Sequence, residues 1–312
     1  MLASPGELPL PGDRSWSYEV KWDGMRVLAT RSRGRLRLTG RSGTDVTNRF
    51  PELVEAAPEH LPDGSVLDGE VVLFDSSGRP SFSLLAPRIQ KARAGTTIRR
   101  PVTYVVFDVL RLGEDDVLKR SYDERRDLLR ESVADTARVT VPGSFDDGAA
   151  LLESTRSQGL EGVVAKRRLS PYRPGVRSPD WVKVPNRRTR SVVIGGWKSR
   201  ADSPSRLASL LVGTPTDDGL LRYDGAVGSG LSDAESRTVL DVLRDIASSS
   251  SSFHGYPAPE EVAGDVLTYV EPLLVVDVEH LGRTANALLR QPTVVRLRPD
   301  LSYHDIVDGE GA

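Results

Sequence analysis

Hydrophobic and polar residues alternate along most of the first half of the chain, as is typical of half-buried β-strands. The pattern predicts three successive strands at residues 17–22, 25–32 and 35–40, separated by Asp23-Gly24 and Arg33-Gly34 turns. Further strands are expected at 65–74, 102–110, 162–166 and 181–184, and helices at 49–57, 122–131 and 147–157. Strands with few long helices between them indicate an α+β fold with antiparallel sheets.

The second half continues the alternation, with strands expected at 192–197, 207–213, 220–227, 273–280 and 293–297 and a helix at 232–246. Several strands with one good helix in a short segment predict a small β-barrel of the oligonucleotide-binding kind, an OB-fold. A basic stretch without apolar residues, 186–190, follows Pro185 and is interpreted as the place of the domain boundary. We therefore expect two domains, residues 1–188 and 189–312.

Composition excludes several classes of protein. The chain is 38% hydrophobic and 28% charged, and it has no apolar run long enough to span a membrane. Its first residues lack a basic start followed by an apolar segment, so no secretion signal is expected. It has no cysteine, which rules out disulfides and cysteine-bound metals and fits a reducing cytoplasm.

The small net charge of −2 conceals an asymmetry. Residues 1–190 carry 32 basic and 26 acidic side chains, and residues 191–312 carry 10 and 18. The first half is thus basic (+6) and the second acidic (−8), which favours contact of the first half with a polyanion. An unevenly charged but merely solvated surface explains the same numbers.

One of the few lysines stands in a chemically distinctive segment. Period two places Tyr18, Val20 and Trp22 on one face of the expected strand and Glu19, Lys21 and Asp23 on the other. One face can pack while the other presents an amine between two carboxylates. Taken alone, an ordinary amphipathic hairpin accounts for this pattern.

Lys21-Trp22-Asp23-Gly24 followed by Arg26 resembles the first motif of the covalent nucleotidyltransferases, which include ATP-dependent DNA ligases, RNA ligases and mRNA capping enzymes. Segments similar to the other motifs follow in order, at 68–72, 104–110, 161–167, 181–184 and 297–300. The sequence at 170–185 is similar to that of bacterial ATP-dependent DNA ligases, especially the ligase modules of end-joining systems. The resemblance extends from Trp16 to Asp305.

The resemblance implies an adenylation domain followed by an OB-fold domain, and an enzyme that seals nicks in duplex DNA through a lysyl-AMP intermediate. It implies ATP and Mg²⁺ (or Mn²⁺) as cofactors, with a role in DNA repair. Nicked duplex DNA and end-joining or repair proteins are the expected partners. We expect a monomer in the cytoplasm, associated with the bacterial nucleoid.

By position in the motifs, Lys21 is the expected nucleophile, and Glu161 and Glu70 are the expected metal ligands. The residues expected to contact the nucleotide are Glu19, Arg26, Arg41, Glu70, Phe107, Lys166, Lys183 and Arg298. Phe107 is expected to stack on adenine, Glu70 to accept from the ribose hydroxyls, and Arg26 and Arg41 to contact the nucleotide or the DNA 5′ phosphate. For each of these residues, plain packing or solvation is the competing explanation.

Lysine must attack the α-phosphate as a free amine, so nearby cations are needed to disfavour its charged form. Glu19 and Asp23 act in the opposite direction, which gives the expected metal ion its importance. Glu161 and Lys166 are five positions apart, so a flat strand would point them to opposite faces. Both can serve one pocket only if the strand bends or Glu161 lies in the preceding turn.

Two positions depart from the family pattern: Pro185 and Leu301 stand where lysines are usual. Their loss weakens the expected charging step with ATP. An RNA ligase or capping-type guanylyltransferase, which shares the lysine motif, is one alternative. A non-catalytic nick-binding homologue, which these two losses leave without the charging step, is the other. In the acidic second half, Arg222, Arg283 and Arg290 are candidates for DNA contact.

Overall fold

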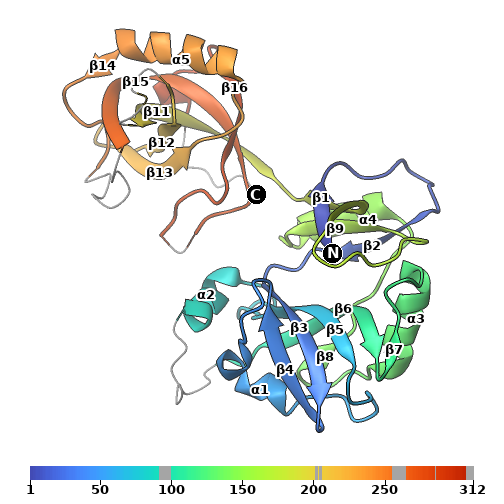
Figure 1. The fold of residues 1–312 in the computed structure, drawn as a ribbon. Coiled ribbons are helices and arrows are strands. Elements are labelled where there is room, and N and C mark those ends of the chain that lie inside the picture. Colours follow the sequence, from blue (N-terminus) through green and yellow to red (C-terminus); the bar gives the residue numbers. More distant parts are fainter. Residues whose placement is uncertain (91–99, 201–202, 204–205, 255–264, 285, 307–312) are drawn as a thin grey trace. The chain divides into compact units, whose positions relative to one another are not determined.

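The computed structural model describes residues 1–90, 100–200, 203, 206–254, 265–284 and 286–306. Contacts along the chain divide it into two units, Met1–Asn186 and Arg187–Ala312. Both are built mainly from antiparallel strands, so the predicted α+β class is confirmed (Figure 1). None of the described helices is long and apolar enough to cross a membrane.

The larger sheet of the first unit has the strand order β4–β3–β5–β6–β7, with β8 paired to β6. Its strands are β3 (Met25–Ser32), β4 (Arg35–Gly40), β5 (Val66–Val72), β6 (Thr103–Leu112), β7 (Asp115–Asp116) and β8 (Val139–Thr140). Arg33 and Gly34 join β3 to β4 with φ values of 52° and 74°. Two positive φ angles match the twist of a tight hairpin, so the predicted turn is confirmed.

The smaller sheet of the first unit has the order β1–β10–β9–β2. Its strands are β1 (Leu2–Pro5), β2 (Trp16–Val20), β9 (Gly162–Arg167) and β10 (Arg177–Pro185). β9 is antiparallel to both of its neighbours, whereas β1 is parallel to β10. Segments from the two ends of this unit thus lie side by side.

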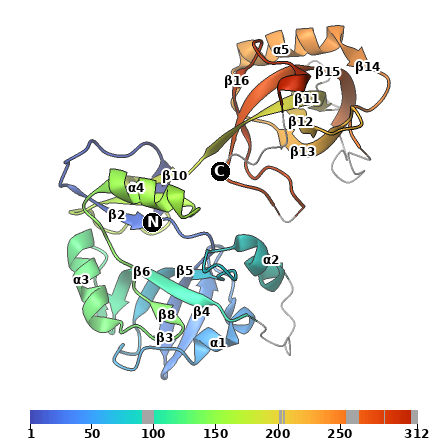
Figure 2. The same cartoon turned by 180° about the vertical axis from the view of Figure 1, so that it is seen from behind.

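Helices of the first unit flank the sheets (Figures 1 and 2). They are α1 (Pro51–Val54), α2 (Phe82–Gln90), α3 (Tyr122–Ser132) and α4 (Gly148–Ser157). α3 begins with a capping box in which Ser121 and Glu124 satisfy each other's backbone N–H groups, and α4 contacts β2 and β9. These two helices fall where the leucine spacing predicts them.

The predicted helix at 49–57 is too long. The structure has a 3₁₀ turn at Thr47–Arg49 and only one α-helical turn, α1. Pro51 fixes the start of the helix, and Pro58 disfavours helical backbone just before it. Phe50 and Leu53 are fully buried against the larger sheet, so packing rather than helix length stabilises this segment.

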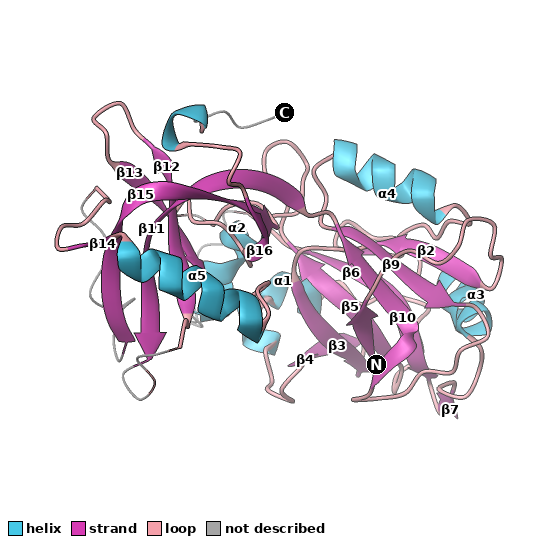
Figure 3. Cartoon of the chain, turned by 90° about the horizontal axis from the view of Figure 1, so that it is seen from above, coloured by secondary structure: helices cyan, strands magenta, loops and turns pink. Residues whose placement is uncertain are grey.

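The second unit is an antiparallel sheet of order β13–β12–β11–β15–β14, with β16 also paired to β15. Its strands are β11 (Arg188–Arg200), β12 (Ser209–Pro215), β13 (Leu221–Val227), β14 (Ala247–Ser248), β15 (Asp265–His280) and β16 (Thr293–Leu297). α5 (Asp233–Asp245) lies across this sheet (Figure 3) and buries Val239, Leu240 and Leu243 in its core. Among the described residues the strand pairings do not close into a ring, so the sheet is more open than the predicted barrel.

The basic stretch at the expected domain boundary is mostly strand. β11 starts at Arg188 and pairs with β15 from its first residue, Arg188 opposite His280. Backbone pairing needs no apolar side chains at this end of a strand, which is why hydrophobic pattern alone missed it.

Candidate active site

Lys21 follows directly after the last residue of β2. In that strand Tyr18 is 3% exposed and packs into an apolar cluster, whereas the carboxylate of Glu19 pairs with Lys166. The backbone N–H of Lys21 donates to the carbonyl oxygen of Gly162 at 2.8 Å. The alternation therefore places Glu19 and Lys21 on the same side, away from the apolar cluster.

Glu161 forms an ion pair with Lys21, with 2.5 Å between Nζ and Oε1. It lies in the turn just before β9, which begins at Gly162. Gly162 has a φ of 133°, and a Cβ there would come within 2.3 Å of the Val184 carbonyl oxygen. This glycine changes the direction of the chain, so that Glu161 pairs with Lys21 and Lys166 pairs with Glu19, on one side of β2, despite the five-residue spacing.

Glu70 is in β5, opposite Arg26 of the neighbouring strand β3 in the sheet register. Burial raises the pKa of its carboxyl group to about 8, against the opposing charges of Lys21 and Arg26, and the negative charge of Glu161 adds to the rise. Glu70, Glu161 and the Lys21 amine are thus close enough to interact electrostatically.

Arg26 is held by a buried carboxylate. Its Nε and Nη2 donate to Asp68 at 3.0 and 2.6 Å, and the Tyr172 hydroxyl donates to the same carboxylate at 2.7 Å. The guanidinium group also lies 5.4 Å from the ring centroid of Phe107 and 5.7 Å from that of Trp181. Arg26 is thus fixed at the wall of the pocket, between the two sheets of the first unit.

Lys166 is 2% exposed and bridges the two sheets. Its Nζ lies 3.0 Å from Glu19 Oε2 and donates to the Phe107 carbonyl oxygen at 3.3 Å. The same nitrogen lies 4.6 Å and 4.4 Å from the ring centroids of Phe107 and Trp181. Burial lowers the pKa of this lysine, with the Glu19 charge acting in the opposite direction.

Lys183 and Arg41 lie at two other places in the first unit. Lys183 is in β10, in register with Val164 of β9 and two positions after Trp181, so it shares the face of Trp181.

Arg41 is exposed and lines a cavity of about 600 Å³ together with Arg26 and Arg49. Three guanidinium groups make this cavity suitable for an anion.

Arg298 belongs to the second unit. Its guanidinium group pairs with Asp277 at 3.3 Å and with Asp300 at 2.7 Å. Leu301 packs against the apolar cluster that contains Ile306, so the position that departs from the family pattern serves packing in this chain. Arg222 and Arg283 both pair with the buried Asp224, at 3.6 and 2.7 Å.

The structure therefore gathers most of the predicted residues between the two sheets of the first unit. They are Glu19, Lys21, Arg26, Glu70, Phe107, Glu161 and Lys166. Sequence reasoning did not single out Asp68, Tyr122, Tyr172 or Trp181, which hold this group in place. For Asp68 a signal was present, because it shares a strand face with Glu70.

The fit of a metal ion rests on two carboxyl groups, Glu70 and Glu161. A magnesium ion in a phosphate site needs only one or two protein carboxylates, since phosphate oxygens and water complete its shell. Within the described part of the chain no group of three or more His, Cys, Asp or Glu side chains could hold an ion alone. The donor set thus fits a cation that binds together with phosphates.

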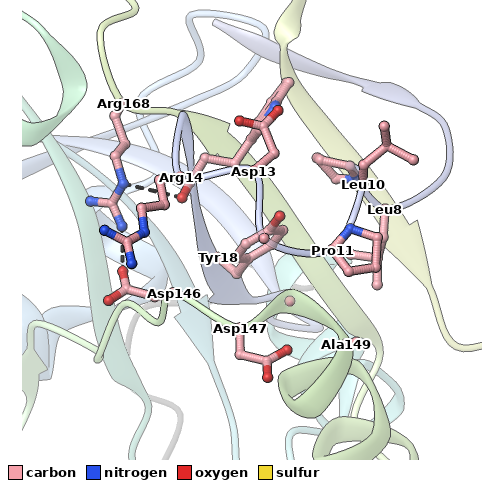
Figure 4. Close-up of a pocket in the computed structure, with 14 residues that line it drawn as sticks. Leu8, Leu10, Pro11, Asp13, Arg14, Tyr18, Asp146, Asp147, Ala149 and Arg168 are labelled. Carbon is pink, nitrogen blue, oxygen red and sulfur yellow. Dashed lines mark hydrogen bonds and ion pairs between the residues drawn. The ribbon is translucent and has the colours of Figure 1, made fainter.

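A cavity of about 740 Å³ lies on the other side of β2 (Figure 4). Leu8, Leu10 and Pro11 line one side of it, and Tyr18 lies at its base. Because Tyr18 and Glu19 point to opposite faces of β2, this cavity is separate from the lysine pocket.

Comparison with known proteins identifies the family to which this chain belongs. Residues 8–184 match the family model "ATP dependent DNA ligase domain", and residues 203–301 match "ATP dependent DNA ligase C terminal region". The chain therefore belongs to the ATP-dependent DNA ligase family, as its motifs predict.

Its relatives include the "Multifunctional non-homologous end joining DNA repair protein LigD" of Mycobacterium tuberculosis, 39% identical over 309 residues. That match covers 98% of this chain but 39% of the relative, so the chain spans about two fifths of the length of that protein. "DNA ligase C1" of Mycolicibacterium smegmatis is 36% identical over 223 residues, which are 69% of this chain and 63% of that protein.

Two solved structures are similar over nearly the whole chain. A "mycobacterial DNA ligase D complexed with ATP and MES" has a TM-score of 0.56 and 37% identity, covering 98% of this chain and 96% of that one. The ligase domain of LigD from M. tuberculosis has a TM-score of 0.55 and 38% identity, covering 99% and 97%.

Proposed function

We propose that this chain takes AMP from ATP onto Lys21 and uses it to seal nicks in duplex DNA. The observation that carries the proposal is the place of Lys21. Its amine lies just after the end of β2, 2.5 Å from Glu161 and close enough to Glu70 to interact with it electrostatically. An amine among carboxylates and buried cations suits phosphoryl chemistry better than a solvated surface lysine does.

In the first step the Lys21 nitrogen attacks the α-phosphorus of ATP. The N–P bond forms, the bond from this phosphorus to the bridging oxygen breaks, and pyrophosphate leaves. Attack requires the neutral amine, so the ion pair with Glu161 opens and the proton passes to solvent. The product is AMP bound to Lys21 as a phosphoramidate.

In the second step a 5′-phosphate oxygen of the nick attacks the phosphorus of the bound AMP: a P–O bond forms, the N–P bond breaks, and Lys21 leaves as an amine that takes up a proton from solvent. In the third, the 3′ hydroxyl oxygen attacks the 5′ phosphorus, the phosphodiester forms and AMP leaves. Positioning and charge neutralisation dominate such reactions. Arg26 and Arg41, with Arg49 on the same cavity, are suited to hold a DNA phosphate.

The nucleotide is proposed to lie between the two sheets of the first unit. Phe107 would stack on the base, Glu70 would accept from the ribose, and Lys183 would reach the phosphates. Glu70 and Glu161 would hold a divalent cation (Mg²⁺ or Mn²⁺), which when bound offsets the negative charge of the phosphates. Arg298 stays a proposed nucleotide contact because of its place in the sixth motif, and in the structure it pairs with Asp277 and Asp300.

The biological setting is proposed from the relatives. Those that share most of this chain are described as end-joining DNA repair proteins, so we infer a role in joining broken DNA. Nicked duplex DNA and other end-joining proteins are the proposed partners.

The deciding experiment is the intact mass of the protein after incubation with ATP and Mg²⁺. We expect a mass increase of one AMP, which Lys21→Ala abolishes and Lys119→Ala, at an exposed lysine, leaves unchanged. GTP in place of ATP tests the capping-type alternative, and nicked DNA against nicked RNA tests the RNA-ligase alternative. No AMP on the wild-type protein would support a homologue that binds nicks without catalysis.

A further inference from the structure

The Glu19 carboxylate has an unusual set of neighbours for a candidate nucleotide contact. The Tyr122 hydroxyl donates to its Oε1 at 2.5 Å, and Lys166 pairs with its Oε2 at 3.0 Å. Arg126 lies 3.8 Å from Oε1. Each oxygen is thus engaged by a different side chain, which fixes the plane of the carboxylate.

Tyr122 can only donate in this bond. It is 1% exposed, and burial together with the Glu19 charge raises its pKa well above the ordinary value. A hydroxyl beside an acceptor-only carboxylate directs its single proton to that carboxylate. As the first residue of α3, Tyr122 is placed by the capping box of Ser121 and Glu124.

Glu19 lies close to Phe107, the residue proposed to stack on the base, because Lys166 contacts both of them. It is two positions before Lys21, about 6.6 Å along an extended strand at roughly 3.3 Å per residue. Lys166, which pairs with it, also contacts the ring and the carbonyl oxygen of Phe107. With the α-phosphate at Lys21, the base therefore falls between Phe107 and Glu19.

A carboxylate has about four acceptor sites on its two oxygens, and Tyr122 and Lys166 use one on each. The remaining sites accept but do not donate. Adenine presents an amino group at the edge where guanine presents a carbonyl oxygen, so a fixed carboxylate accepts from adenine and repels guanine.

We propose that Tyr122 is a positioning residue for base selection: its hydroxyl holds Glu19 in the orientation that favours ATP over GTP. This inference rests on the proposed function and names the determinant of its nucleotide specificity. It assigns the first residue of α3 to the pocket, more than one hundred positions from Glu19 in the sequence.

The test compares Tyr122→Phe with Tyr104→Phe. The Tyr104 hydroxyl is equally buried in the first unit but donates to the backbone carbonyls of Val27 and Leu67, so its loss perturbs stability alone. The readout is the ratio of single-turnover rates of AMP and GMP transfer to the protein. We expect the ratio to fall roughly tenfold in Tyr122→Phe, about the effect of one hydrogen bond to a charged group, and to stay constant in Tyr104→Phe.

An unchanged ratio in Tyr122→Phe, with the wild type active, would overturn the inference. A wild type that takes up no AMP would instead overturn the proposed function. If Tyr122→Phe does not fold, a crystal structure of the wild-type protein carrying AMP decides. The base amino group within hydrogen-bond distance of Glu19, with the Tyr122 hydroxyl still bound, supports the inference, and an amino group elsewhere refutes it.

Discussion

Asp68 shows how one buried residue can fix a wall of the pocket. It is 0% exposed, and its carboxylate accepts from Arg26 and from Tyr172. Tyr172 comes from the connection between β9 and β10, so this carboxylate joins the larger sheet to a loop of the smaller sheet. Removal of the negative charge leaves the guanidinium of Arg26 buried beside aromatic rings without its counter-charge.

We predict that Asp68→Asn lowers the free energy of unfolding by about 3 kcal/mol, the loss typical of a broken buried ion pair. Urea unfolding measures it. Glu55→Gln serves as the control, since it breaks an ion pair with Arg35 in which both side chains are 64% exposed. Little change is expected there, and an equal loss in both variants would show that burial does not govern the pair.

At the scale of elements, Glu52 connects α1, α2 and the start of β6. Its carboxylate accepts from Arg88 of α2 at 2.7 and 3.0 Å and from the Val102 backbone N–H at 3.1 Å. Burial opposes ionisation, but these hydrogen bonds outweigh it and lower the pKa of Glu52 below 4.5. A carboxyl whose folded pKa is depressed stabilises the fold above its unfolded pKa and loses that contribution as the pH falls.

Glu52→Gln should therefore cost about 1–2 kcal/mol of stability at pH 7. The difference from wild type should shrink as the pH falls below about 4.5 through the folded pKa of Glu52. Denaturant unfolding at a series of pH values measures both effects. A difference that stays constant with pH would mean that side-chain shape, not charge, accounts for the loss.

Strand positions were the most predictable elements. The limits of β3, β4 and β16 agree with the predicted ranges, and in β4 the buried Leu36 and Leu38 alternate with the exposed Arg35 and Arg37. β1 was not predicted, since it is short and its stability comes from parallel pairing with β10 at the far end of the unit. α2 was missed because Pro87 lies inside it, against the usual rule for helix interiors.

Within the site, the spacing of nearby residues predicted which side chains share a face, but contacts between residues far apart in the sequence could not be predicted. The alternation predicts that Glu19 and Lys21 share a face, and the conformation of Gly162 explains how Glu161 comes to pair with Lys21. The pairing of Lys166 with Glu19 does not follow, because it depends on β9 lying beside β2 in the sheet. The contribution of Tyr122 depends on where α3 packs, which no local pattern encodes.

At the scale of the whole molecule, opposite charges divide along the chain, +6 for residues 1–190 and −8 for the rest. The basic half contains the arginine-lined cavity. Binding of nicked DNA by this half would release counterions and weaken as salt rises.

We predict that Arg41→Gln reduces the slope of log affinity against log salt by about 0.9, the value of one phosphate contact. Arg35→Gln, at the opposite end of β4, is the matched control because this arginine is paired with Glu55, and it should leave the slope unchanged. Fluorescence anisotropy with a labelled nicked duplex measures both. Equal slopes for Arg41→Gln and wild type would exclude Arg41 from the DNA contact.

The junction between the units has a consequence for protein engineering. Asn186 donates its backbone N–H to the Glu161 carbonyl oxygen at 2.9 Å, and its side chain binds Thr155 and Leu160. Only Arg187 separates it from the first residue of β11. A spacer inserted before Asn186 would break its hydrogen bond to Glu161 and displace the carboxylate that pairs with the Lys21 amine. Another module should therefore be fused no earlier than residue 187.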